Sequence, residues 1–239
     1  MSKHSKWAKI KRKKGVADVK KGAAFTKLVN AVAIASREGG GDPDSNFKLR
    51  LAMDSARAAN VPKENIERAI ARATGAGDGA QLETLLYEGF GPGGVAVLVN
   101  ALTDNRNRTV NELKHAFSEH SGTLGASGSV SWGFAKKGII RLEHAPSPEQ
   151  ELTLIDAGAE DIRQEDEVNV ITTDPQRLET VKAVLEKSGV TILEAELAWI
   201  ATTPGPALPH HQQEQLVELL SELEERDDVT GVATNAIFG

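Results

Sequence analysis

The chain has 239 residues, of which 40% are apolar and 26% are charged, a composition typical of a globular protein with two or three small cores. It contains no cysteine, which excludes a disulfide framework, a thiolate nucleophile, a zinc ribbon and an iron–sulfur site, and which fits a reducing compartment. No apolar run is long enough to span a bilayer, and the charged start of the chain lacks the apolar segment of a secretory signal. We therefore expect a cytoplasmic protein that does not contact a membrane.

The net charge of −6 conceals a strong asymmetry along the chain. Residues 1–72 carry 17 lysines and arginines against 7 aspartates and glutamates, whereas the rest of the chain carries 11 against 27. The two segments therefore have net charges of +10 and −16. Folding does not require such a separation, which usually indicates a polyanionic partner for the basic segment.

The first 22 residues show neither helical nor strand periodicity, and we expect them to form a flexible basic arm. Eight residues of this arm are candidate nucleic-acid contacts: Lys3, Lys6, Trp7, Lys9, Lys11, Arg12, Lys13 and Lys14. Lysines that neutralise phosphates release counterions and make binding dependent on salt, and an indole can stack on a base. A solubilising tail is the alternative interpretation of the arm, and packing against the following helices is the alternative for Trp7.

Three helices are expected next, because apolar residues recur there at helical spacing. The expected helices cover residues 23–37, ended by the glycines at 39–41; a segment from Asp44 or Ser45 to about Asn60; and a segment from Pro62 to Ala73. The third helix presents four polar residues outside its apolar stripe: Lys63, Asn65, Arg68 and Arg72. This helix could enter a major groove, although such residues also decorate many solvated helix faces.

Beyond a glycine-rich hinge at 74–81, strands alternate with helices. The expected strands cover residues 85–88, 95–99, 129–134, 138–142, 168–172, 193–199 and 229–234. The expected helices begin after Thr103 or Asp104, at Ser147 with a capping box to Gln150, at Pro175 and at His211. This order predicts two α+β units of split βαβ type, the second inserted in the first. The expected boundaries are an arm at 1–22, a helical domain at 23–80, an α+β domain at 81–135 plus 207–239, and an inserted domain at 136–206.

Two further motifs have both a functional and a plain structural interpretation. Arg106 and Arg108 lie where a strand should meet a helix, and helix starts favour anions, so both are candidate phosphate contacts; alternatively, the preceding residues cap the helix and the arginines are solvated. Gly89, Gly91 and Gly94 match the dinucleotide-binding pattern G-x-G-x-x-G, but a strand rather than a helix is expected after them, which favours a tight hairpin.

No pattern of catalytic residues is present. The six histidines lack the spacing of metal ligands on one helical face, and neither a phosphate-binding loop of the GxxxxGK[ST] type nor a G-x-S-x-G elbow occurs. We therefore predict a non-enzymatic protein with no catalytic residue, no metal, no cofactor and no small-molecule substrate.

Several segments, in their order along the chain, together resemble the YebC/PmpR family over nearly the whole chain. They are KHSKWAKIKRKK (3–14), GGGDP (39–43), VPKENIERAI (61–70), YEGFGPGGV (87–95), TDNRNRT (103–109) and GSVSWGF (128–134). Lys3, Lys9 and Ala233 depart from the family pattern, which usually has glycine, asparagine and tyrosine at these positions. The first two departures make the arm more basic.

The resemblance implies a multidomain α+β fold: an N-terminal three-helix bundle followed by two α+β domains, one of them ferredoxin-like and inserted in the other. It also implies a DNA-binding regulator of transcription. The alternative that it implies is a ribosome-associated translation factor that binds ribosomal RNA, and structured RNA suits a basic arm with a tryptophan well. Sequence alone leaves both nucleic acids open as partners.

Overall fold

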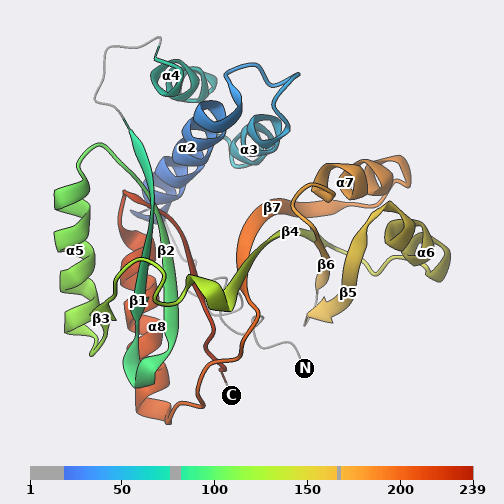
Figure 1. Ribbon diagram of the computed structural model, residues 1–239. Coiled ribbons are helices and arrows are strands. Elements are labelled where there is room, and N and C mark those ends of the chain that lie inside the picture. Colours follow the sequence, from blue (N-terminus) through green and yellow to red (C-terminus); the bar gives the residue numbers. More distant parts are fainter. Residues whose placement is uncertain (1–18, 76–81, 166–167, 239) are drawn as a thin grey trace. The chain divides into compact units, whose positions relative to one another are not determined.

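The computed structural model describes residues 19–75, 82–165 and 168–238, with the backbone alone for residues 19–24 (Figure 1). These residues form two compact units. Residues 135–200 make up one, which we call the inserted unit. The segments on either side of it in the chain, 19–134 and 201–238, make up the other, the main unit. The fold is the expected multidomain α+β fold, with an N-terminal helical region followed by two antiparallel sheets.

Three helices open the main unit: α2 (Val19–Gly39), α3 (Phe47–Ala58) and α4 (Lys63–Ala73). They share an apolar core that includes Val32, Leu49 and Ile66, and Leu102 of the following sheet also packs into it. All three helices were expected, and Gly40 supplies the left-handed end of α2 with a φ of 88°. The expected caps of α3 are wrong, because Asn46 is the N-cap and its side chain accepts a hydrogen bond from the Leu49 amide.

The sheet of the main unit is antiparallel, with the strand order β3-β1-β2-β8. Its strands are β1 (Glu83–Phe90), β2 (Ala96–Thr103), β3 (Thr123–Leu124) and β8 (Val229–Thr234). Two helices, α5 (Arg106–Glu119) and α8 (His210–Glu225), pack on one face of this sheet (Figure 1). Their fully buried side chains, among them Phe117 and Leu216, meet Val97 and Val99 of β2. The last strand, β8, therefore completes the first sheet, and the last helix, α8, covers one face of it.

The glycine-rich motif joins β1 to β2 and confirms the expected hairpin. Its turn is a short 3-10 segment, η1 (Pro92–Gly94), in which Gly93 and Gly94 have φ values of 69° and 79°. Gly89 has another role, because an added Cβ would lie 2.6 Å from the ring of Phe117. The glycines thus serve a tight turn and close packing rather than a bound dinucleotide.

The expected strand at 129–134 is wrong. Residues 131–133 form a 3-10 turn, η2 (Ser131–Gly133), and the next strand begins only at Phe134. The cause is the carboxylate of Glu88, which is 4% exposed and accepts hydrogen bonds of 2.7–2.8 Å from the backbone amides of Gly128, Val130 and Ser131. Burial alone would raise the pKa of Glu88, but these amides outweigh it and lower the pKa below its usual value.

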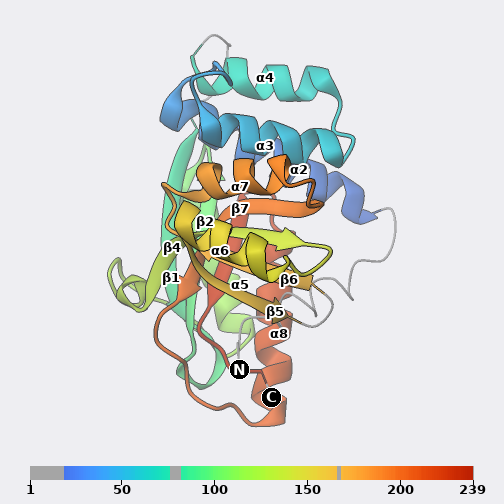
Figure 2. The ribbon, with the colours of Figure 1, turned by 90° about the vertical axis from the view of Figure 1, so that its right-hand side faces the viewer.

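The inserted unit has the strand and helix order of a split βαβ pair: β4 (Phe134–Leu142), α6 (Pro148–Ala157), β5 (Ala159–Glu165), β6 (Val168–Thr173), α7 (Leu178–Lys187) and β7 (Ile192–Ala201). Its sheet has the order β5-β6-β4-β7, which is the ferredoxin-like arrangement. Helices α6 and α7 lie side by side on one face of this sheet (Figure 2). The capping box between Ser147 and Gln150 is confirmed, whereas β5 was not expected and α7 begins three residues later than expected.

Candidate nucleic-acid interface

The basic arm is the first part of the predicted interface. Its eight candidate contacts, Lys3, Lys6, Trp7, Lys9, Lys11, Arg12, Lys13 and Lys14, lie outside the described residues. Their role therefore stays a prediction from charge and composition. The structure bears on the two other groups of candidates, which are on α4 and at the start of α5.

Helix α4 is held against α3 by a short turn. Asn60 takes a left-handed φ of 62°, which asparagine tolerates better than most residues, and the Val61 amide donates a 2.9 Å hydrogen bond back to the carbonyl of Ala56. Val61 and Ile66 are 5% and 2% exposed, so the apolar side of α4 is fixed on the helical core. The polar side of the helix is thereby turned to solvent.

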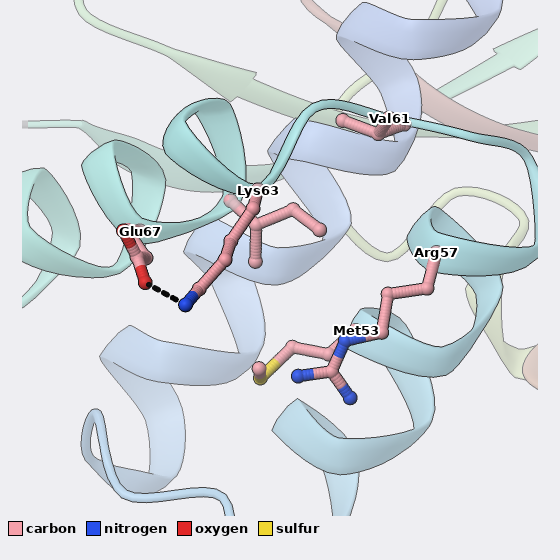
Figure 3. Close-up of a pocket in the computed structure, with 6 residues that line it drawn as sticks. Met53, Arg57, Val61, Lys63 and Glu67 are labelled. Atoms are coloured by element: carbon pink, nitrogen blue, oxygen red, sulfur yellow. Dashed lines mark ion pairs between the residues drawn. The ribbon is translucent and has the colours of Figure 1, made fainter.

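The four candidates on α4 divide between two edges of the helix. Asn65, Arg68 and Arg72 are three and four residues apart and form one stripe, in which both arginines are exposed. Arg68 has no ion pair with the described residues. Lys63 lies on the other edge, toward α3, where its Nζ is 3.4 Å from Glu67 Oε1 (Figure 3). Only Asn65, Arg68 and Arg72 therefore share one polar face, on which Arg68 and Arg72 supply the positive charge.

Helix α5 begins one residue later than expected, with Asn105 rather than Thr103 or Asp104 as its N-cap. The Asn105 side chain accepts a 3.1 Å hydrogen bond from the Arg108 amide, while the hydroxyl of Thr103 accepts one from the Asn105 amide. Arg106, at the first helical position, is exposed and forms no ion pair within the described part of the chain. Its guanidinium is therefore available to an anion.

Arg108 is in a different situation, because two carboxylates already bind its guanidinium. Its Nη2 is 2.9 Å from Asp228 Oδ2 and 3.2 Å from Asp104 Oδ1. Thr109 and Thr103 also donate to Asp228, at 2.7 and 3.1 Å. Burial alone would raise the pKa of Asp228, but the hydrogen bonds from Thr109, Arg108 and Thr103 lower it, and the bond to Asp228 raises the pKa of Arg108. Arg108 thus joins the start of α5 to the residue before β8, and its positive charge is already paired with carboxylates.

The two groups of candidates on α4 and α5 meet around Asp104. Its carboxylate is 3.2 Å from Arg108 of α5 and 3.9 Å from Arg72 of α4. A hydrogen bond of 3.0 Å from the Asn30 side chain to the Asp227 carbonyl also ties α2 to the start of β8 at this corner. Arg72 and Arg108 therefore share one acidic partner. We call the region around Asp104 the basic corner; it comprises the α4 stripe of Asn65, Arg68 and Arg72 and the first turn of α5 with Arg106.

Sequence reasoning missed the two acidic residues that organise the basic corner. Asp104 was considered only as a cap, and Asp228 lies 120 residues beyond Arg108. No local spacing links residues so far apart. Arg57 of α3, which lines the same cavity as Lys63, was also missed, although its position in the last turn of a helix with more basic than acidic residues was a usable signal.

A cluster of metal ligands and a membrane-spanning helix are two features that the described residues do not show. Among them, no group of three or more histidine, aspartate or glutamate side chains is placed to hold a metal ion. His120, for instance, bonds to Glu222 at 2.8 Å and links α5 to α8. Within the same residues, no helix combines the length and the apolar character needed to cross a bilayer.

Comparison with known proteins covers nearly the whole chain. The family model described as the TACO1/YebC protein N-terminal domain matches residues 5–76, and the one described as the TACO1/YebC second and third domain matches residues 82–236. A probable transcriptional regulatory protein of Desulfitobacterium hafniense is 46% identical over all of this chain and 96% of its own length. One from Thermoanaerobacter pseudethanolicus is 49% identical over 98% of this chain and 96% of its own.

A solved structure agrees with these relatives. The crystal structure of a conserved hypothetical protein from Aquifex aeolicus matches with a TM-score of 0.83 and 44% identity, over 92% of this chain and 91% of that one. Two family models and close relatives along almost the full length point to the same conclusion: the chain belongs to the TACO1/YebC family.

Proposed function

We propose that the protein is a non-enzymatic regulator of gene expression that binds DNA and acts on transcription. The names of its relatives, probable transcriptional regulatory proteins, support a regulatory role. The observation that carries the proposal is the basic corner, where Arg72 of α4 and Arg108 of α5 both lie beside Asp104 and the same two helices carry the exposed Arg68 and Arg106. Phosphate backbones are the common ligand of such a surface, and charge-assisted contacts to them dominate affinity for DNA.

The residues of the basic corner have separate roles in this proposal. Arg68 and Arg106 are exposed and unpaired among the described residues, so they bind phosphates directly. Arg72 is shared, because Asp104 at 3.9 Å neutralises part of its charge. Asn65, on the same stripe of α4, is the residue suited to read a base edge. The arm adds sequence-independent affinity next to this surface.

The first test measures the salt dependence of DNA binding. Titrations of a duplex from the chain's own promoter region, followed by fluorescence anisotropy at several salt concentrations, give the slope of log affinity against log salt. Arg68→Gln should lower affinity and reduce that slope by about 1, as expected for one lost phosphate contact.

Lys114→Gln is the matched control, since it removes one exposed positive charge on α5 about 12 Å beyond Arg106. It should leave the affinity and the slope unchanged. An equal loss of DNA affinity in the two variants would mean that binding depends only on the net charge of the protein, and the basic corner would then not be the interface. Equal affinity of the wild-type protein for promoter and random duplex would contradict sequence-specific regulation.

A further inference from the structure

Helices α3 and α4 line a partly open cavity of about 160 Å³ (Figure 3). It lies on the edge of α4 that carries Lys63 and Glu67, away from the stripe of Asn65, Arg68 and Arg72. Its floor is apolar and consists of Met53, Val61 and Ile66, which are 8%, 5% and 2% exposed. Its rim is charged: Arg57 and Lys63 supply two cations, and Glu67 supplies one carboxylate.

The rim side chains are only loosely held. Lys63 Nζ is 3.4 Å from Glu67 Oε1, with side chains 88% and 61% exposed, and Arg57 Nη1 is 3.6 Å from Asp54 Oδ1, with side chains 61% and 47% exposed. Ion pairs this exposed contribute little to stability, so both cations can turn to another anion at low cost. In Figure 3 the guanidinium of Arg57 lies beside Met53, and Lys63 extends over the same space from the opposite helix.

The shape and charge of the cavity restrict its ligand. The volume corresponds to about five water molecules at liquid density, enough for one small ring and too little for a drug-sized molecule. The apolar floor suits the face of that ring, the two cations suit a phosphate attached to it, and the Glu67 carboxylate suits an N–H donor on its edge. A pyrimidine nucleotide has all three features.

A shallow site of this size cannot hold a free nucleotide tightly, because association entropy would outweigh its few contacts. A nucleotide within a strand that the protein already binds avoids this cost, since its effective concentration at the cavity is high. The cavity and the basic corner share α4, so a strand bound at one lies within reach of the other.

We propose that this cavity holds an unpaired pyrimidine base of the bound nucleic acid, with its phosphate on Arg57 and Lys63. The proposal rests on the proposed function for the presence of nucleic acid and adds the form that this nucleic acid takes at α4: one base is out of its duplex stack. The proposal also gives Lys63 a phosphate contact at the cavity that is separate from the phosphate contacts of Arg68 and Arg72 at the basic corner.

Methionine labelling gives a direct test, because the chain has two methionines, Met1 and Met53. The full chain, carrying ¹³C-methyl methionine, is titrated with a single-stranded oligothymidylate and with an abasic strand of the same length. The Met53 methyl signal, assigned by its loss in Met53→Leu, should move upfield with oligothymidylate, since a base over the methyl group shields it. The abasic strand should leave it in place.

Two substitutions separate the cavity from the basic corner. Arg57→Gln with Lys63→Gln should reduce the Met53 shift at saturating oligothymidylate. Arg68→Gln should weaken binding yet reach the full shift, because it does not touch the cavity. If anisotropy shows that oligothymidylate binds while the Met53 signal stays in place, or moves equally with the abasic strand, the cavity proposal is overturned and the proposed function stands. If wild-type protein binds neither strand nor duplex, the proposed function itself fails.

Discussion

Asp228, at the residue scale, determines how much of the positive charge at the basic corner is available to a ligand. Its side chain is 16% exposed, and it accepts hydrogen bonds from Arg108, Thr103 and Thr109. The same carboxylate therefore stabilises the first turn of α5 and neutralises one of its two arginines. Arg106, two residues before Arg108, remains exposed. Asp228, together with Asp104, thus distinguishes the paired Arg108 from Arg106, which has no ion pair among the described residues.

Asp228→Asn should separate these two effects. The amide keeps the shape but loses the charge-assisted hydrogen bonds, so the free energy of unfolding at pH 7 should fall by about 1–3 kcal/mol. Among the described residues, Arg108 should then keep only Asp104, at 3.2 Å, and Glu112, at 4.0 Å, as carboxylate partners. More of its charge is then available to phosphate, and DNA affinity should rise along with the salt slope. Chemical denaturation and anisotropy titration measure the two quantities. Lower stability with unchanged DNA affinity would place Arg108 outside the interface.

The pH dependence of this stability difference follows from the lowered pKa of Asp228 in the folded protein. A depressed carboxylate pKa stabilises the fold fully above the unfolded pKa of about 3.9, and this contribution is lost as pH falls through the lower folded value. The difference between wild type and Asp228→Asn should therefore be constant near neutral pH and shrink below about pH 4. A difference that grows in acid would contradict this account.

At the element scale, periodicity was sufficient for the helices but not for every strand. The three helices that open the main unit, α2, α3 and α4, have apolar residues at helical spacing, and the sequence predicts all of them. The segment at 129–134 looks like a strand in the sequence. Its backbone amides, however, donate to the carboxylate of Glu88, which lies 42 positions before Val130. Strand β5 was missed because it lies at the edge of its sheet and most of its residues are polar, which hides the alternation.

Packing between elements explains one glycine of the β1–β2 motif and makes it testable. A Cβ on Gly89 would lie 2.6 and 2.7 Å from ring atoms of Phe117 on α5 and 3.0 Å from the Thr123 carbonyl of β3. Gly89→Ala should therefore push α5 from the sheet and lower the free energy of unfolding by about 1–3 kcal/mol. Gly133→Ala is the control, because its Cβ would meet nothing within 4 Å. Denaturant titration compares them, and equal stabilities would refute the close-packing role.

At the scale of the whole molecule, the sequence predicts which residues are basic but not which of them gather. Arg72 and Arg108 were separate candidates on separate helices, and only the folded main unit brings both to Asp104. Lys63 looked equivalent to Arg68 in sequence, yet it lies toward the cavity under α3. Positions that depend on strand pairing between distant segments, such as Thr103 with Asp228, have no local signature.

The charge asymmetry of the chain predicts how binding is shared between the arm and the folded units. Five charges of the arm, at Lys9, Lys11, Arg12, Lys13 and Lys14, can be replaced together by glutamine without touching any core residue described in the structure. Each lost phosphate contact lowers the salt slope by about 0.9 on B-DNA, so this variant should lose up to about 4.5 units of slope, against about 1 for Arg68→Gln.

Both variants are measured by the same anisotropy titrations, with circular dichroism to confirm an unchanged fold. Because the arm contributes charge without reading bases, its loss should weaken promoter and random duplex equally and leave their affinity ratio unchanged. The loss of Asn65 by Asn65→Ala should instead reduce that ratio. An arm variant with an unchanged slope would move the whole interface to the basic corner and leave the arm as a solubilising tail.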